Sequence, residues 1–148
     1  MALWQRLIVP QRREEAMTEP RKIERDRQRL MNPVTLERLA ANASDLSRTH
    51  GLINVFHVFA EASVVALSRD LEGAGFSIED GGEPLLHGGS RYWKVEARVD
   101  MVPVLAALNL MTDSCVDIAV RNSVDYDGWY TEVVTRGELS DGEAGQGS

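Results

Sequence analysis

The stretch Asp125-Tyr126-Asp127-Gly128-Trp129-Tyr130 predicts a tight turn that leads into the last strand of the domain, Trp129–Thr135. Asp-Gly favours a turn because glycine reaches positive φ without a Cβ clash and aspartate bonds nearby backbone N–H groups. A tryptophan placed there contributes apolar burial and needs an acceptor for its indole N–H. We therefore expect Gly128 and Trp129 to shape a corner between a helix and the closing strand.

The segments before this corner alternate between strand and helix patterns. Leu52–Phe59 is β-branched and aromatic with almost no polar break, which predicts a strand covered on both faces. Tyr92–Val99 has a period of two, which puts Trp93 on a packed side and Tyr92, Lys94, Glu96 and Arg98 on a side that meets water or a partner. Apolar stripes predict helices over about 62–72 and 108–122, a short alternation predicts a strand over 76–79, and 81–89 resembles an irregular connection.

The resulting order is strand, helix, strand, strand, helix, strand. This order is typical of the α+β, ferredoxin-like arrangement, in which a four-stranded antiparallel sheet carries both helices on one face. The other face of the sheet would stay uncovered. Because the first strand is apolar on both sides, we expect the N-terminal helix, a second subunit or a partner to cover it.

The N-terminal third divides into an arm and a helix. Residues 1–31 are charged and arginine-rich, which predicts a mobile arm or a frayed helix in solvent, and Met17 and Met31 are alternative starts. The alternative is a basic arm that contacts nucleic acid or the acidic face of a neighbour. Asn32 is a suitable N-cap with Pro33 at the first helical position, so a helix is expected from Pro33 to about Leu46. The domain is expected over 32–136, and the polar, glycine-bearing residues 137–148 predict a disordered tail.

Composition narrows the classes of function. The chain has 148 residues, a net charge of −7 and one cysteine. No apolar run of membrane-spanning length occurs, and a lone cysteine fits a reducing, cytoplasmic setting. The positive charge lies before residue 49, and the acidic remainder would be repelled by phosphates, so direct nucleic-acid binding by the domain is not expected.

Catalytic patterns are weak. His50, His57 and His87 lack metal-ligand spacing, and no phosphate-cradling glycine loop or activated nucleophile is recognisable. We therefore expect no enzymatic activity and no cofactor. One alternative stays open, a metal-dependent hydrolase that uses His57, Asp125 and Asp127.

Three motifs together resemble a known family. Tyr126-Asp127-Gly128-Trp129, Val55-x-His57-x-Phe59 and Gly75-Phe76-x-Ile78 are similar to segments of the regulator of ribonuclease activity B family, the ribonuclease E inhibitor proteins. The similarity covers about Met31–Thr135. It implies a compact ferredoxin-like domain without catalytic activity that binds the endoribonuclease and lowers its cleavage of RNA.

An inhibitor of this kind would use an acidic surface to meet a basic, arginine-rich segment of the nuclease or its scaffold. The residues expected to contact the partner are His57, Asp125, Tyr126, Asp127 and Tyr130, whereas Gly128 and Trp129 shape the turn. The alternative is a module that pairs with itself through the exposed sheet face, without a nuclease partner.

Overall fold

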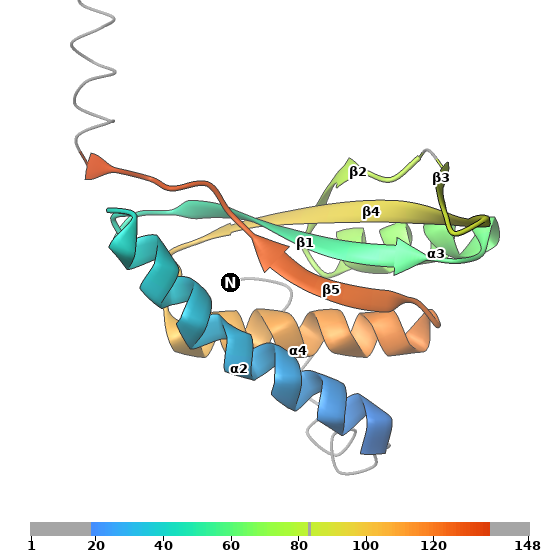
Figure 1. Ribbon diagram of the computed structural model, residues 1–148, viewed down its shortest axis with the longest axis horizontal. Helices are drawn as coiled ribbons and strands as arrows, with labels where there is room; N and C mark the ends of the chain where they lie inside the picture. Colours follow the sequence, from blue (N-terminus) through green and yellow to red (C-terminus); the bar gives the residue numbers. More distant parts are fainter. Residues whose placement is uncertain (1–18, 83, 137–148) are drawn as a thin grey trace, which may run out of the picture.

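The computed structural model describes residues 19–82 and 84–136 (Figure 1). Its elements follow in the order α2 (Glu19–Ala41), β1 (His50–Val58), α3 (Glu61–Gly73), β2 (Ser77–Asp80), β3 (Pro84–His87), β4 (Ser90–Met101), α4 (Leu105–Arg121) and β5 (Asp125–Tyr130). Within these ranges, every helix is too short or too polar to span a membrane.

The sheet is antiparallel at every pairing, and the α+β class is confirmed. Its order is β2-β4-β1-β5, and β3 pairs with β4 beside this path. Five strands are thus present where four were predicted. The fifth, β3, forms a hairpin with β4, because Gly88 and Gly89 have φ of 58° and 81°, as a two-residue hairpin turn requires. The prediction of an irregular connection over 81–89 was therefore wrong.

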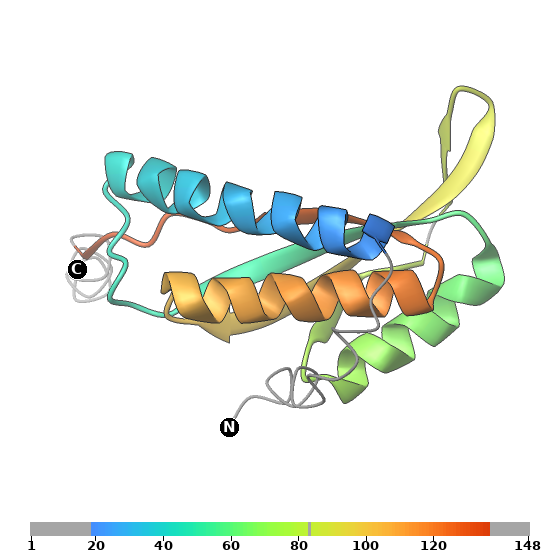
Figure 2. The ribbon, with the colours of Figure 1, turned by 90° about the horizontal axis from the view of Figure 1, so that it is seen from below.

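The core lies between the sheet and the helices. Figure 2 shows α4 between α2 and α3, all three on the same side of the sheet. The helices α3 and α4 contribute fully buried side chains such as Leu67 and Met111, and β1 contributes Leu52, Phe56 and Val58. Cys115 of α4 is buried in this cluster, as its apolar stripe predicted.

The other face of the sheet is open. Along β1, burial alternates, and the outward residues Gly51, Ile53, Val55 and His57 are only partly buried. Within residues 19–82 and 84–136 no element covers this face, and its coverage by a second subunit or a partner stays a prediction. The N-terminal helix does not cover this face, because α2 packs beside α4 on the opposite side of the sheet.

The helix α2 begins at Glu19, fourteen residues before the predicted first helical residue Pro33, continues through Pro33 and ends at Ala41 instead of Leu46. Residues 19–31 of the predicted arm are therefore helical, while residues 1–18 and the predicted tail 137–148 lie outside the described residues. Asn32 is not a cap. It is fully buried in the middle of the helix, where its side chain makes tertiary hydrogen bonds.

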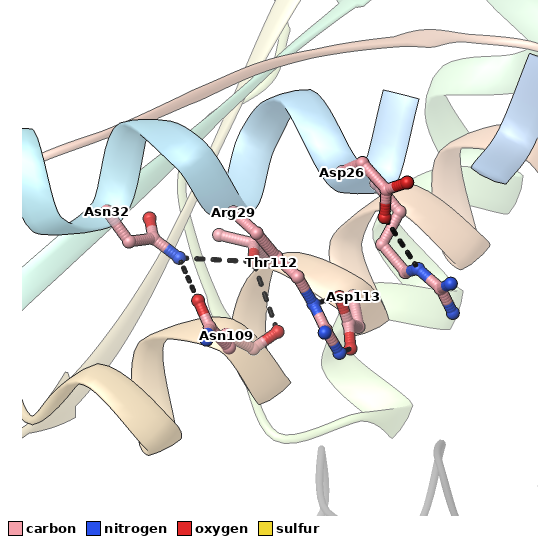
Figure 3. A network of polar contacts seen from close by, with 7 residues as sticks. Asp26, Arg29, Asn32, Asn109, Thr112 and Asp113 are labelled. Carbon is pink, nitrogen blue, oxygen red and sulfur yellow. Dashed lines mark hydrogen bonds and ion pairs between the residues drawn. The ribbon is translucent and has the colours of Figure 1, made fainter. Parts of the chain in front are cut away.

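Polar contacts hold α2 against α4 (Figure 3) and also against β5. The Asn32 amide nitrogen donates to Asn109 Oδ1 over 2.9 Å, and Arg29 forms a two-pronged ion pair with the buried carboxylate of Asp113. From β5, the Trp129 indole donates to Asn32 Oδ1 over 2.8 Å. These bonds offset the cost of burying an amide, which explains why a charged, polar helix packs on the domain.

The stretch that opened the sequence analysis is itself the last strand. Phe56 faces Tyr126 and Asn54 faces Trp129, so Asp127 and Gly128 oppose the single residue Val55. Two residues against one is a β-bulge, and Gly128 has the positive φ (99°) that such a bulge favours. The prediction of a tight turn before a strand over Trp129–Thr135 was therefore wrong, because Asp127 and Gly128 bend a strand that begins at Asp125 and ends at Tyr130.

Candidate interaction surface

Three strands contribute side chains to the open sheet face. In the cross-strand register, His57 of β1 lies between Lys94 of β4 and Asp125 of β5, and Ile53 lies between Arg98 and Tyr130. Directly opposed residues of an antiparallel pair share a face. The strands therefore bring together groups more than seventy residues apart in the sequence.

One end of this face is aromatic. The rings of His57 and Tyr92 meet edge to face with centroids 5.4 Å apart, and the nearby Phe59 is 57% exposed. With Ser90 they line a shallow depression of about 420 Å³. Exposed aromatic groups of this kind supply a large part of the binding energy at protein interfaces.

The centre of the face is acidic around Tyr130. Its hydroxyl donates to Glu96 over 3.0 Å. Partial desolvation raises the pKa of Tyr130, and the hydrogen bond to Glu96 and the charges of Asp80 and Glu132 add to this effect. Carboxylates thus gather on one side of an exposed phenol, an arrangement that attracts cations.

Arg98 crosses β1 on the same face. The guanidinium lies directly over Gly51: a Cβ there would come within 2.6 Å of it, so a side chain at this position would displace the end of Arg98. Arg98 pairs with Asp100 over 2.8 Å, and this bond raises the pKa of the guanidinium. With Tyr130 and Glu132, Arg98 lines a second depression of about 470 Å³.

The predicted contact residues divide into three groups. His57, Asp125 and Tyr130 lie together on the open face. Asp127 is exposed but lines a different groove, between β5 and α2, with Gly128 and Trp129. Tyr126 is only 6% exposed: its ring packs on Phe56 at 5.1 Å and its hydroxyl donates to Asn54 over 2.7 Å. Its side chain belongs to the core, and the prediction that it contacts a partner was wrong.

The alternative metal site is not assembled. Although His57 and Asp125 face one another, Asp127 lies in the groove beside α2. Among residues 19–82 and 84–136, no three histidine, cysteine or carboxylate side chains are grouped closely enough to hold a metal ion. The hydrolase hypothesis therefore has no site in this part of the chain.

Comparison with known proteins identifies the fold's family. Residues 31–131, about two-thirds of the chain, match the family model described as regulator of ribonuclease activity B. The chain belongs to this family. A comparison with curated proteins found no match. The regulator family is a regulatory, non-catalytic family.

The open sheet face lies inside the region that matches the regulator family, whereas the first half of α2 lies before that region. All the open-face residues of β1, β4 and β5 lie inside the regulator domain, whereas residues 19–30 of α2 precede it. Tyr92, Glu96 and Arg98 were not among the predicted contact residues. The period-two pattern of Tyr92–Val99 was the signal for them, because it had put all three on the outward side.

Proposed function

We propose that this chain binds an endoribonuclease of the ribonuclease E type and lowers its cleavage of RNA, without a catalytic step of its own. Membership of the regulator family supports the class of partner. The observation that carries the proposal is the open sheet face, where His57, Asp125 and Tyr130 lie together on a surface that no described helix covers. The free, buried Cys115 suits an encounter in the reducing cytoplasm.

The charges of the face favour a basic segment of the nuclease. Its two central cations already have acidic neighbours, Lys94 with Glu96 and Arg98 with Asp100. An arginine-rich segment that crosses β4, β1 and β5 would find carboxylates at Glu96 and Asp125 and an aromatic ring at each end. Charge complementarity speeds such an encounter, and the aromatic contacts slow its dissociation. Cleavage falls because the bound segment can no longer engage RNA.

The experiment is a titration of the ribonuclease of the same cell with the full chain, in which binding and RNA cleavage are measured on the same samples at low salt. Asp125→Lys and Asp127→Lys form a matched pair, because both carboxylates are exposed on one strand but only Asp125 shares the open face with His57. We expect Asp125→Lys to weaken binding about tenfold, and Asp127→Lys to change it less than twofold.

Tyr130 provides the aromatic test. Tyr130→Ala removes the ring and should weaken binding about tenfold, whereas Tyr130→Phe keeps the ring, loses only the bond to Glu96 and should bind nearly as well. If Asp125→Lys and Tyr130→Ala both bind as the wild type does, the open face is not the contact surface. If the unmodified chain neither binds the nuclease nor slows cleavage, the proposed function is wrong.

A further inference from the structure

The outward side of α2 carries a regular line of exposed residues. Ile23, Arg27, Leu30, Val34, Glu37 and Ala41 follow one another at alternating spacings of four and three residues, and all six are exposed. Ile23 and Leu30 are 58% and 71% exposed, unusual for large apolar side chains in a helix that packs on a domain. This spacing is the seam of a coiled coil, which places two residues of every seven, about one in each helical turn, against a partner helix.

A second line on α2 faces the domain. Arg25, Asn32 and Leu39 are seven residues apart, and all three have largely buried side chains. In a heptad they stand diametrically opposite the exposed seam. Figure 2 shows α2 at one edge of the helix layer, with α4 on one side of it. The domain therefore occupies one side of α2 and leaves the seam to solvent.

We propose that two copies of this chain pair through this seam, with their α2 helices antiparallel. In this arrangement Ile23 of one copy faces Ala41 of the other, Arg27 faces Glu37 and Leu30 faces Val34. Because the two copies are related by a two-fold axis, each of these contacts occurs twice. Every pair is complementary, either an opposite charge or apolar against apolar. On one flank of the seam, Glu24 meets Arg38 and the exposed Met31 meets its own copy.

The same residues exclude the parallel arrangement. Parallel helices in register would oppose Arg27 to Arg27 and Glu37 to Glu37 in the centre of the seam, where like charges repel. Antiparallel pairing turns both repulsions into attractions. The sequence of α2 is thus complementary to itself in one orientation only, and this complementarity identifies a second copy as the occupant.

Pairing requires little rearrangement of the single chain. Arg27 forms an ion pair with Glu24 in the monomer, and exposed ion pairs of this kind contribute little, so its exchange for Glu37 of the copy is inexpensive. Pro33 lies on the flank of the seam. The paired length, residues 23–41, is about 27 Å at 1.5 Å per residue, which is short for a coiled coil. We therefore expect reversible pairing that depends on protein concentration.

Pairing through α2 leaves both open sheet faces free, because α2 lies on the helix side of the sheet. The pair would present two such faces, and a partner with two basic segments would be held more firmly than by either face alone. The pairing itself does not rest on the proposed function, since it follows from residues 23–41 alone.

The test measures mass in solution for the full chain and three variants by sedimentation equilibrium, from about 10 µM to 1 mM, where weak pairing is detectable. The wild type should approach twice the 16.4 kDa of one chain. Arg27→Glu and Glu37→Arg should each weaken pairing about tenfold, because each puts like charges together. The double variant R27E/E37R should restore pairing, since the swap recreates both attractions.

Lys22→Glu is the matched control, because it reverses an exposed charge of α2 outside the seam and should leave pairing unchanged. Cross-linking reports the orientation. The double variant L30C/V34C should form a disulfide between copies under mild oxidation, while L30C alone should form little, because antiparallel pairing brings residue 30 to residue 34.

Four outcomes would overturn the proposal. A mass of one chain over the whole concentration range excludes pairing. A pair that Arg27→Glu and Glu37→Arg leave intact lies on another surface, such as the open sheet face. Failure of R27E/E37R to restore pairing, with circular dichroism showing the folded helix content, contradicts the facing of these residues. Efficient cross-linking of L30C alone indicates parallel helices.

Discussion

The hydrogen bond between Trp129 and Asn32 permits a quantitative test of how α2 is held. Asn32→Leu keeps the size of the side chain but removes two short hydrogen bonds, of 2.8 and 2.9 Å, and a long one of 3.4 Å to Thr112. The two short bonds contribute about 1 kcal/mol each, the long one contributes little, and the Trp129 N–H left without its acceptor adds about 1 kcal/mol more. We expect Asn32→Leu to lower the free energy of unfolding by about 3 kcal/mol.

Trp129→Phe removes the donor from the other side. It leaves the fully buried Asn32 oxygen without this bond and replaces the indole with a smaller ring, so we expect a loss of about 2 kcal/mol. The double variant loses the Trp129–Asn32 hydrogen bond only once, and it leaves neither the indole N–H nor the amide oxygen buried without its partner. The double loss should therefore be about 1.5–2 kcal/mol smaller than the sum of the single losses.

Urea unfolding followed by circular dichroism measures all three variants, because this signal does not depend on the tryptophan that is changed. Asn42→Leu is the matched control: Asn42 is exposed after the end of α2, and its loss should cost about 0.5 kcal/mol or less. Additive losses from Asn32→Leu and Trp129→Phe would show that the two side chains do not interact, and the docking of α2 described above would be refuted.

Three further predictions concern single positions. Gly128→Ala should cost about 1–2 kcal/mol in the same urea assay, because alanine is strained at φ of 99°. Gly73→Ala is the control and should be neutral or stabilising, because it lies at the end of α3 where a Cβ meets no atom. Equal effects of the two substitutions would contradict the bulge. Cys115 should resist iodoacetamide in the folded state, because it is fully buried and burial raises the pKa of its thiol; labelling as fast as in urea would disprove its burial. Hydrogen bonds from the Ser47 hydroxyl and backbone amide lower the pKa of Asp45 in the folded protein. The carboxylate therefore stabilises the fold above the pKa of about 4 that it has in the unfolded chain, and this stabilisation is lost as the pH falls through the lowered pKa of the folded state. Asp45→Asn should therefore lose less stability than the wild type when unfolding is compared at pH 6 and pH 3, and an equal loss would contradict the bonds to Ser47.

The sequence predicted the elements that depend on local pattern. The helices α3 and α4 and the strands β1, β2 and β4 lie where apolar periodicity indicated them, because their side chains pack on one common core. The period of β4 even identified the outward residues that the candidate contact set omitted. Periodicity reports which side of an element is buried, and the helix side of this sheet is mainly apolar, although β1 also places the polar side chains of His50 and Asn54 there.

The errors occurred where a residue type serves two structural uses. Asn-Pro is typical of a helix start, yet Asn32 is buried inside α2 because Trp129, Asn109 and Thr112 surround its amide, and these partners are about 80 to 100 residues away. Asp-Gly is typical of a turn, yet Asp127 and Gly128 form a bulge that satisfies the same φ requirement.

The bulge also explains the error at Tyr126. An extra residue in β5 reverses the alternation of inward and outward side chains, so Tyr126 and Trp129, three residues apart, both face the helices. A strict period of two would have put them on opposite sides. The sequence alone does not show where the bulge lies, so it does not show which residues of β5 face outward. For this reason the predicted contact residues included Tyr126, which faces the core.

The location of all three helices on one side of the sheet has a consequence for how such a protein can be altered. Substitutions at outward positions such as Val55, His57 or Lys94 remove no atoms from the core, so their effect on folding is small. A library that randomises these positions should therefore consist largely of folded proteins. The same scaffold could be selected to recognise different partners, and the specificity of a regulator of this architecture can diverge without loss of its stability.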